Sequence, residues 1–175
     1  MLGDLGLLIL RIVLGIVFMA HGSQKLFGWF GGPGLKGFSG WMASMGLRPA
    51  ALWGLIAALF EFGGGLLTIL GLLNPIGPLA IIAVMLMATI KVHLGKGFWN
   101  SKGGYEFPLV NIASALAVAL IGPGTYSLDA ALGTHLPEPA TLLVGVVLVI
   151  LGLVVALGTQ QRQPAVQGQP GESRA

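Results

Sequence analysis

The sequence predicts an all-α membrane protein, namely a four-helix transmembrane bundle with an appended fifth transmembrane helix. Hydrophobic residues make up 55% of the 175 residues and charged residues only 9%, whereas soluble domains carry roughly 25% charged residues. The mean hydropathy is +0.89. A span needs about 20 largely apolar residues, and the apolar residues gather into five runs, at 5–27, 50–73, 75–94, 107–121 and 139–158.

Turn-forming residues and one arginine define how these runs are used. Arg11 interrupts the first run where a signal peptide needs an unbroken apolar centre, so we expect a retained first helix. Asn74 and Pro75 form a short turn, which makes the second and third spans antiparallel neighbours. We therefore divide the chain into a four-helix core over 1–132, the appended helix over 133–159, and a disordered cytoplasmic tail over 160–175.

Two short helices are expected outside the spans. Apolar side chains recur at helical spacing after a glycine-rich break at 28–34, at Leu35, Phe38, Trp41, Met42 and Met45. This amphipathic segment either lies in the membrane interface or caps the end of the bundle. Ser127 is suited to cap a second short helix that ends at Leu132.

The lysines and arginines other than Arg11 fall on one side of the predicted membrane. The loops on that side carry, within them or at their edges, Lys25, Lys36, Arg48, Lys91, Lys96 and Lys102, and the tail carries Arg162 and Arg174. The opposite side carries Asp4, Asp129 and Glu138. Because basic loops stay in the cytoplasm, we expect the N-terminus outside and the C-terminus in the cytoplasm.

Arg11 and Glu61 lie deep within predicted spans, where ionisable residues usually pair. At about 1.5 Å per residue, Arg11 lies about 9 Å from the outer edge and Glu61 about 16 Å from the inner edge. In a core about 30 Å thick their backbones then differ by about 5 Å in depth. An intramembrane Arg11–Glu61 ion pair is therefore predicted, either as a structural clamp or as part of a polar path.

A second group of titratable residues gathers near the cytoplasmic ends of three spans. His21 and Lys25 are four residues apart and share a helix face, and His93, Tyr105 and Glu106 come from the junction of the third and fourth spans. An intramembrane histidine with such neighbours is a candidate proton-handling or ligand site. Lys91 is better explained as a lysine whose ammonium reaches the interface.

Several kinds of chemistry are not expected. The chain has no cysteine, which excludes a disulfide and a thiolate nucleophile. The histidines match no metal-ligand spacing, and no basic stripe interleaved with aromatics suggests nucleic-acid binding. The glycines at 15, 22, 63–65, 71, 145 and 152 are interpreted as small residues that permit close helix packing.

Several motifs give the chain a resemblance to the DoxX family of small bacterial membrane proteins. They occur in the family's order, as AHGSQKLFG at 20–28, EFGG at 61–64, VH at 92–93 with GF at 97–98, GGYEFP at 103–108 and GPGTYSLD at 122–129. The resemblance covers about residues 5–132. The fifth span departs from it, because the family's core has four helices.

The resemblance implies a membrane subunit of a quinone-linked redox assembly, concerned with sulfur or oxidative stress, in the bacterial plasma (inner) membrane. Relatives include the small membrane subunit of an archaeal thiosulfate:quinone oxidoreductase, and others are linked to assemblies with superoxide dismutase and a sulfurtransferase. His21 would donate or accept a proton at a quinone oxygen, with Lys25 and Glu106 tuning it. The chain would be at most a subunit of an oxidoreductase, with no intrinsic cofactor.

The partners expected are the lipid bilayer, a soluble redox partner on the basic cytoplasmic face, and a second copy of the chain in a homo-oligomer. Two other functions stay open on the sequence alone. A structural anchor or assembly factor would use the polar residues only to lock the bundle. A small transporter would line a polar path with Arg11, His21 and Glu61.

Overall fold

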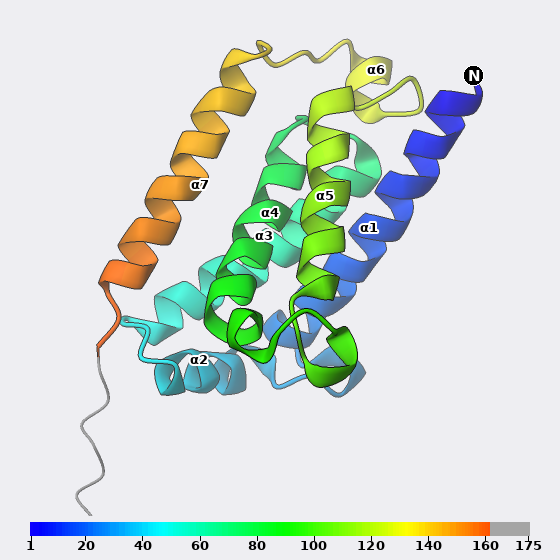
Figure 1. Ribbon diagram of the computed structural model, residues 1–175. Coiled ribbons are helices and arrows are strands. Elements are labelled where there is room, and N and C mark those ends of the chain that lie inside the picture. The colour runs from blue at the N-terminus through cyan, green and yellow to red at the C-terminus, as the bar shows by residue number, and fades with distance from the viewer. Residues whose placement is uncertain (162–175) are drawn as a thin grey trace, which may run out of the picture.

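The computed structural model describes residues 1–161, and every regular element within that range is helical (Figure 1). The predicted tail lies outside the described residues from position 162 onward. Short 3-10 turns and one π-helical turn join the α-helices, which are α1 (Leu2–Leu26), α2 (Gly34–Ser44), α3 (Ala50–Leu70), α4 (Ile76–Ala88), α5 (Glu106–Ile121), α6 (Leu128–Leu132) and α7 (Ala140–Gly158).

Four helical segments are long and apolar enough to cross a membrane, and a fifth is shorter. The four are Leu2–Leu26, Ala50–Leu70, Ile76–Lys96 and Ala140–Gly158. The third of these includes a π-helical turn at Thr89–His93, which the sequence did not predict. The shorter apolar helix is α5, with 16 residues. The all-helical fold is thus confirmed, with four candidate membrane spans and a shorter apolar helix where the fourth of the five spans was predicted.

Glycines bring α1 and α3 into close contact. A Cβ on Gly15 would lie 2.5 Å from the Gly65 carbonyl oxygen, and a Cβ on Gly65 would lie 2.7 Å from the Gly15 oxygen. Gly22 is similarly close to the backbone of Phe62. Larger residues would force the two helices apart, so these glycines set the α1–α3 register.

The core of the bundle forms where α1, α4 and α5 meet. Its buried residues are Leu14 and Phe18 from α1, Ile81, Val84 and Met85 from α4, and Ala115 from α5. Partly buried Ala57 of α3 packs against the same cluster. The four predicted core spans therefore surround one apolar interior.

The two short helices have defined positions. Phe38 and Met42 of α2 are buried together with Leu47, and α2 packs on α3, as expected for a cap over the end of the bundle. Ser127 caps α6, because its hydroxyl oxygen accepts a hydrogen bond from the Ala130 amide at 3.1 Å. The predicted capping role of Ser127 is confirmed.

The two ends of the bundle differ in charge. The end formed by α2 and the turns after α4 carries Lys36, Arg48, Lys91, Lys96 and Lys102, and we call it the basic end. At the opposite end, where α1 begins and α6 lies, are Asp4, Asp129 and Glu138, and we call it the acidic end (Figure 1).

Helix α7 stands beside the bundle rather than within it (Figure 1). Gly145 lies directly against Leu79 of α4, as its predicted packing role requires, but a Cβ on Gly152 would meet nothing within 4 Å. At the basic end, the Trp53 indole N–H donates a hydrogen bond to the Thr159 hydroxyl oxygen at 3.0 Å. Helix α7 is therefore attached at separate places along its length.

Candidate ligand site

Arg11 is buried and bonded to backbone carbonyls. Its side chain is 2% exposed, and its guanidinium donates to the carbonyl oxygens of Thr68 at 3.1 Å, Ile69 at 2.9 Å and Tyr126 at 2.9 Å, and also to that of Pro123. The last carbonyls of a helix have no partner within the helix. Arg11 therefore ties the end of α3 to the loop before α6.

The predicted Arg11–Glu61 ion pair is not formed. Gly15 packs against Gly65, and Arg11 lies one helical turn before Gly15. Arg11 is therefore level with Ile69, at the end of α3. The depth prediction failed because it assumed that both spans begin at the membrane edges, whereas the first turns of α1 extend beyond the end of α3. Glu61 lies nearer the basic end, opposite the last turns of α1.

Glu61 pairs with Lys25 instead. The Lys25 ammonium donates to Oε1 of Glu61, and Nζ also lies 4.9 Å from the centroid of the Phe38 ring. Glu61 is 4% exposed, and its buried Oε2 accepts no hydrogen bond from any described residue. A buried carboxylate oxygen without a donor is costly, so this atom is the clearest mark of a binding site in the described chain.

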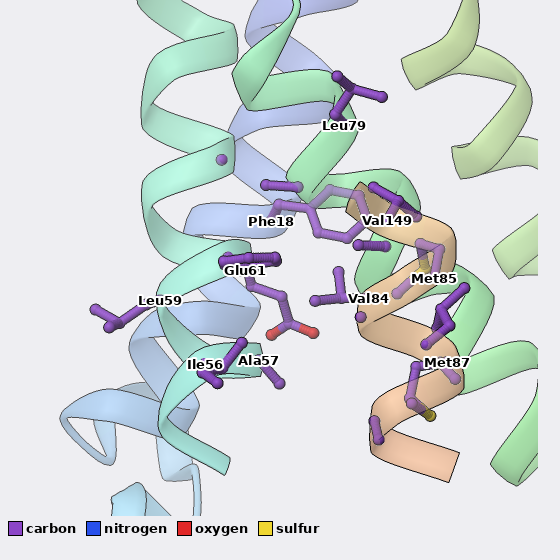
Figure 2. A pocket seen from close by; sticks show the side chains of 18 of the residues that line it. Phe18, Ile56, Ala57, Leu59, Glu61, Leu79, Val84, Met85, Met87 and Val149 are labelled. Atoms are coloured by element: carbon purple, nitrogen blue, oxygen red, sulfur yellow. The ribbon is translucent and has the colours of Figure 1, made fainter. Parts of the chain in front are cut away.

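Glu61 faces a large pocket between the bundle and α7. The pocket has a volume of about 1210 Å³, compared with roughly 300–1,000 Å³ for typical small-molecule sites. Figure 2 shows the Glu61 carboxylate pointing from α3 into the space bounded by Val84 and Met85 of α4 and Val149 of α7. The α7 lining extends from Ala140 to Ala156, which is about 24 Å at ~1.5 Å per residue.

The titratable side chains on the pocket wall do not extend along its whole length. They are His21, Lys25, Glu61, Lys91 and His93, which come from the later turns of α1, the middle of α3 and the turn after α4. Towards the acidic end the wall is mostly apolar, with residues such as Ile76, Leu79 and Val144. The titratable side chains thus lie in one half of a largely apolar pocket, which we call the polar half, and this arrangement suits an amphiphilic ligand.

The two histidines are held differently. The His21 ring is exposed at the pocket wall and meets the Phe107 ring edge-on, with centroids 6.3 Å apart. The His93 Nδ1 lies 2.7 Å from the Gly103 carbonyl oxygen. Because a carbonyl only accepts hydrogen bonds, Nδ1 carries the proton, and Nε2 is the nitrogen left to a ligand when the ring is neutral.

Tyr105 and Glu106 lie off the pocket wall. The Tyr105 ring packs edge-on against Phe98 with centroids 5.5 Å apart. The backbone N–H of Asn100 donates a hydrogen bond to Oε2 of Glu106 at 2.9 Å. Both side chains hold the turn that joins α4 to α5. Of the predicted cluster, the structure brings His21, Lys25 and His93 to the pocket.

Sequence reasoning missed two components of this site, Glu61 and α7. Glu61 was assigned to the wrong partner, although the glycines at 15 and 65 carry the register that places it. Helix α7 has no ionisable residue and offered no chemical signal, yet it supplies one side of the pocket. Among residues 1–161, no three metal-ligating side chains lie close enough to hold an ion.

Comparison with known proteins places these features in a family context. The family model described as DoxX matches residues 6–94, a range that contains both Lys25 and Glu61. No solved structure matches the chain.

Three relatives match this chain over most of their own length. The Bacillus subtilis (strain 168) protein named "Putative oxidoreductase CatD" is 31% identical over 126 residues, which cover 72% of this chain and 86% of the relative. Two Escherichia coli (strain K12) proteins are similar as well. Inner membrane protein YphA is 32% identical, covering 70% of this chain and 87% of the relative, and inner membrane protein YqjF is 30% identical, covering 73% and 92%.

Proposed function

The chain belongs to the DoxX family and is a multi-pass membrane protein, and on that premise we propose that it is the quinone-binding membrane subunit of a redox assembly. The observation that carries the proposal is the Lys25–Glu61 pair, which lies on the wall of a long apolar pocket. A quinone has a polar ring and, in membranes, a long apolar tail. The polar and apolar halves of the pocket fit those two parts.

The residues around the polar half have separate tasks in this proposal. Lys25 and Glu61 bind and orient the polar ring, and apolar side chains such as Phe18 and Met85 exclude water from it. His21 is exposed at the wall and exchanges a proton between the ring and the aqueous side. Glu106 contributes through the turn that it holds rather than by direct contact.

The electrons come from a partner. The chain has no cysteine to form a redox disulfide or hold an iron–sulfur cluster, so a soluble redox protein must supply them. The basic end offers it an attractive surface, with Lys36, Arg48, Lys96 and Lys102 outside the pocket wall. An oxidoreductase activity is named for the relative CatD, and such an activity here would belong to the assembly.

We place the protein in the inner membrane, with the basic end and the C-terminus in the cytoplasm. The support is the inner-membrane location named for YphA and YqjF and the concentration of lysines and arginines at one end of the bundle. This orientation puts the polar half of the pocket on the cytoplasmic side, within reach of a cytoplasmic partner.

Filling the pocket tests the proposal. Gly63 and Gly152 both line the pocket, and a Cβ at either would meet nothing within 4 Å. Gly63→Phe combined with Gly152→Phe therefore adds two rings to the cavity. Gly3→Phe combined with Gly6→Phe is the matched control, because these α1 glycines are equally unobstructed and lie off the pocket.

The measurement is the isoprenoid quinone extracted from protein purified in mild detergent. We expect comparable quinone per protein in the wild type and the control pair, and at least about tenfold less in the pocket-filled pair. Absence of quinone from the wild type, or equal amounts in all three proteins, would contradict the proposal and favour a structural anchor.

A further inference from the structure

We propose that the pocket selects the hydroxyl-bearing, reduced form of its ligand, a hydroquinone, over the quinone. This inference rests on the proposed function, since it names which form of the ligand the site recognises. The atom that carries it is Oε2 of Glu61, which is buried and accepts no hydrogen bond from the described residues. It belongs to a carboxylate that points into the pocket (Figure 2).

The ion pair determines what Oε2 requires. Lys25 donates to Oε1 of the same carboxylate and forms an ion pair with it. An ionised carboxylate can only accept hydrogen bonds. The group that completes the site must therefore be a donor, and the ring oxygens of a quinone offer no proton whereas the hydroxyls of a hydroquinone do.

No described protein group supplies that donor. Lys25 donates to Oε1 and lies over the face of Phe38. His93 has its Nδ1 on the Gly103 carbonyl, and His21 lies against Phe107. Oε2 can therefore accept a hydrogen bond from a ligand hydroxyl.

The rest of the ligand must be long and apolar and reach the site from the bilayer. The pocket lining includes the exposed apolar side chains of Leu59 and Phe60 of α3 and of Val144 and Leu148 of α7, and Leu148 is 62% exposed. Helix α7 packs mainly on α4. The pocket therefore meets the lipid-facing surface between α3 and α7, where an amphiphile can pass sideways from the membrane.

Three probes with the same decyl tail test this selection on the purified full-length protein. They are a benzoquinone, the corresponding hydroquinone, and the dimethyl ether of that hydroquinone, which has the same ring but no donor. Because hydrogen bonds to charged groups are stronger than those between neutral groups, the wild type should bind the hydroquinone at least about tenfold more tightly than the ether or the quinone. For a two-electron couple, a tenfold preference raises the midpoint potential of the bound pair by about 30 mV.

The Glu61→Gln variant tests the role of Oε2, because it replaces a hydrogen-bond acceptor with a donor at nearly constant shape. The introduced carboxamide has nearly the same shape, and with its oxygen on Lys25 it points an N–H donor into the pocket. The preference for the hydroquinone should then be lost, because the oxygens of all three probes can accept a hydrogen bond from that N–H. A thermal melt confirms that the variant is folded, and the three probes on the wild type test the inference independently of the variant.

The outcomes separate the inference from the proposed function. Equal binding of all three probes, or a preference for the quinone, would overturn the inference while leaving quinone binding intact. Failure of every probe to bind would overturn both. Monoolein, a hydroxylated lipid without the aromatic ring, is a fourth probe. Tighter binding of monoolein than of the hydroquinone would overturn the inference and assign the site to a lipid headgroup.

Discussion

Arg11 and Glu61 are buried charged residues on facing helices, and they differ in how completely their hydrogen bonds are satisfied. The guanidinium of Arg11 donates to four backbone carbonyls at the acidic end of the bundle. The carboxylate of Glu61 has one oxygen on Lys25, and the other finds no donor among residues 1–161 at a pocket of about 1210 Å³. Burial and charge alone would have made the two residues look alike.

The difference indicates which charge serves the fold and which serves a ligand. A saturated buried group joins the elements around it, as Arg11 joins α1, the end of α3 and the loop before α6. A buried group that lacks a partner lowers stability unless something binds to it. Substitutions at the acidic end should therefore affect the free energy of unfolding, and those around Glu61 should affect binding.

The largest stability effect is expected at Arg11. Arg11→Leu leaves four carbonyls without their donor, and we expect a loss of about 3 kcal/mol in the free energy of unfolding, at roughly 0.6–1 kcal/mol for each bond. Arg11→Lys keeps a charge and three donors and should recover part of the loss. Unfolding in mixed detergent micelles measures the free energy of both variants. An Arg11→Leu variant as stable as the wild type would contradict the structural role that distinguishes Arg11 from Glu61.

Asp129 should come next, because it belongs to the same end. Asp129 is buried, and its two carboxylate oxygens accept hydrogen bonds from the backbone N–H groups of Leu73 and Asn74, each at 2.9 Å. Asp129→Ala should therefore cost about 2 kcal/mol of unfolding free energy. Quinone content measured on the folded fraction should not change, and a selective loss of quinone would place binding at the wrong end.

Filling the pocket should have little effect on stability. In the Gly63→Phe and Gly152→Phe pair, each ring enters open space, and replacing a helical glycine favours the helix by a few tenths of a kcal/mol. We expect the free energy of unfolding to stay within about 1 kcal/mol of the wild type while quinone content falls. A loss of several kcal/mol would mean that the cavity walls cannot accept the rings.

The smallest effect is expected where α7 meets the basic end. Thr159→Val removes the hydroxyl that accepts from the Trp53 indole, but that N–H also lies 3.3 Å from the Arg48 carbonyl oxygen. The loss should be less than about 1 kcal/mol. Faster hydrogen exchange confined to the last turn of α7 would show that this contact anchors the helix, and unchanged exchange would show that it does not.

Much of the fold could be predicted from the sequence because the signals that define each helix lie within a few residues of one another. The apolar runs, the Asn74–Pro75 turn and the Ser127 cap all act through neighbouring residues, and each appears where it was expected. The π-helical turn at Thr89–His93 had no such local signal. Local patterns therefore locate helices better than they describe irregularities within them.

The candidate site was predictable only in part, because it depends on how helices pack. Placing His21, Lys25 and His93 at one depth required only the order of the spans, and all three line the pocket. Pairing Glu61 required the α1–α3 register, which the Gly15–Gly65 contact sets. The role of α7 depended on where an apolar helix docks, and its sequence does not specify that.

The most direct test of the account is to remove the Lys25–Glu61 pair without leaving a buried charge. Replacing both residues, by Lys25→Met and Glu61→Leu, should leave the free energy of unfolding within about 1 kcal/mol of the wild type, since apolar residues of similar size can replace a buried pair. Quinone extracted per purified protein should fall at least about tenfold. A stable double variant that retains wild-type quinone content would contradict the claim that this pair forms the ligand site.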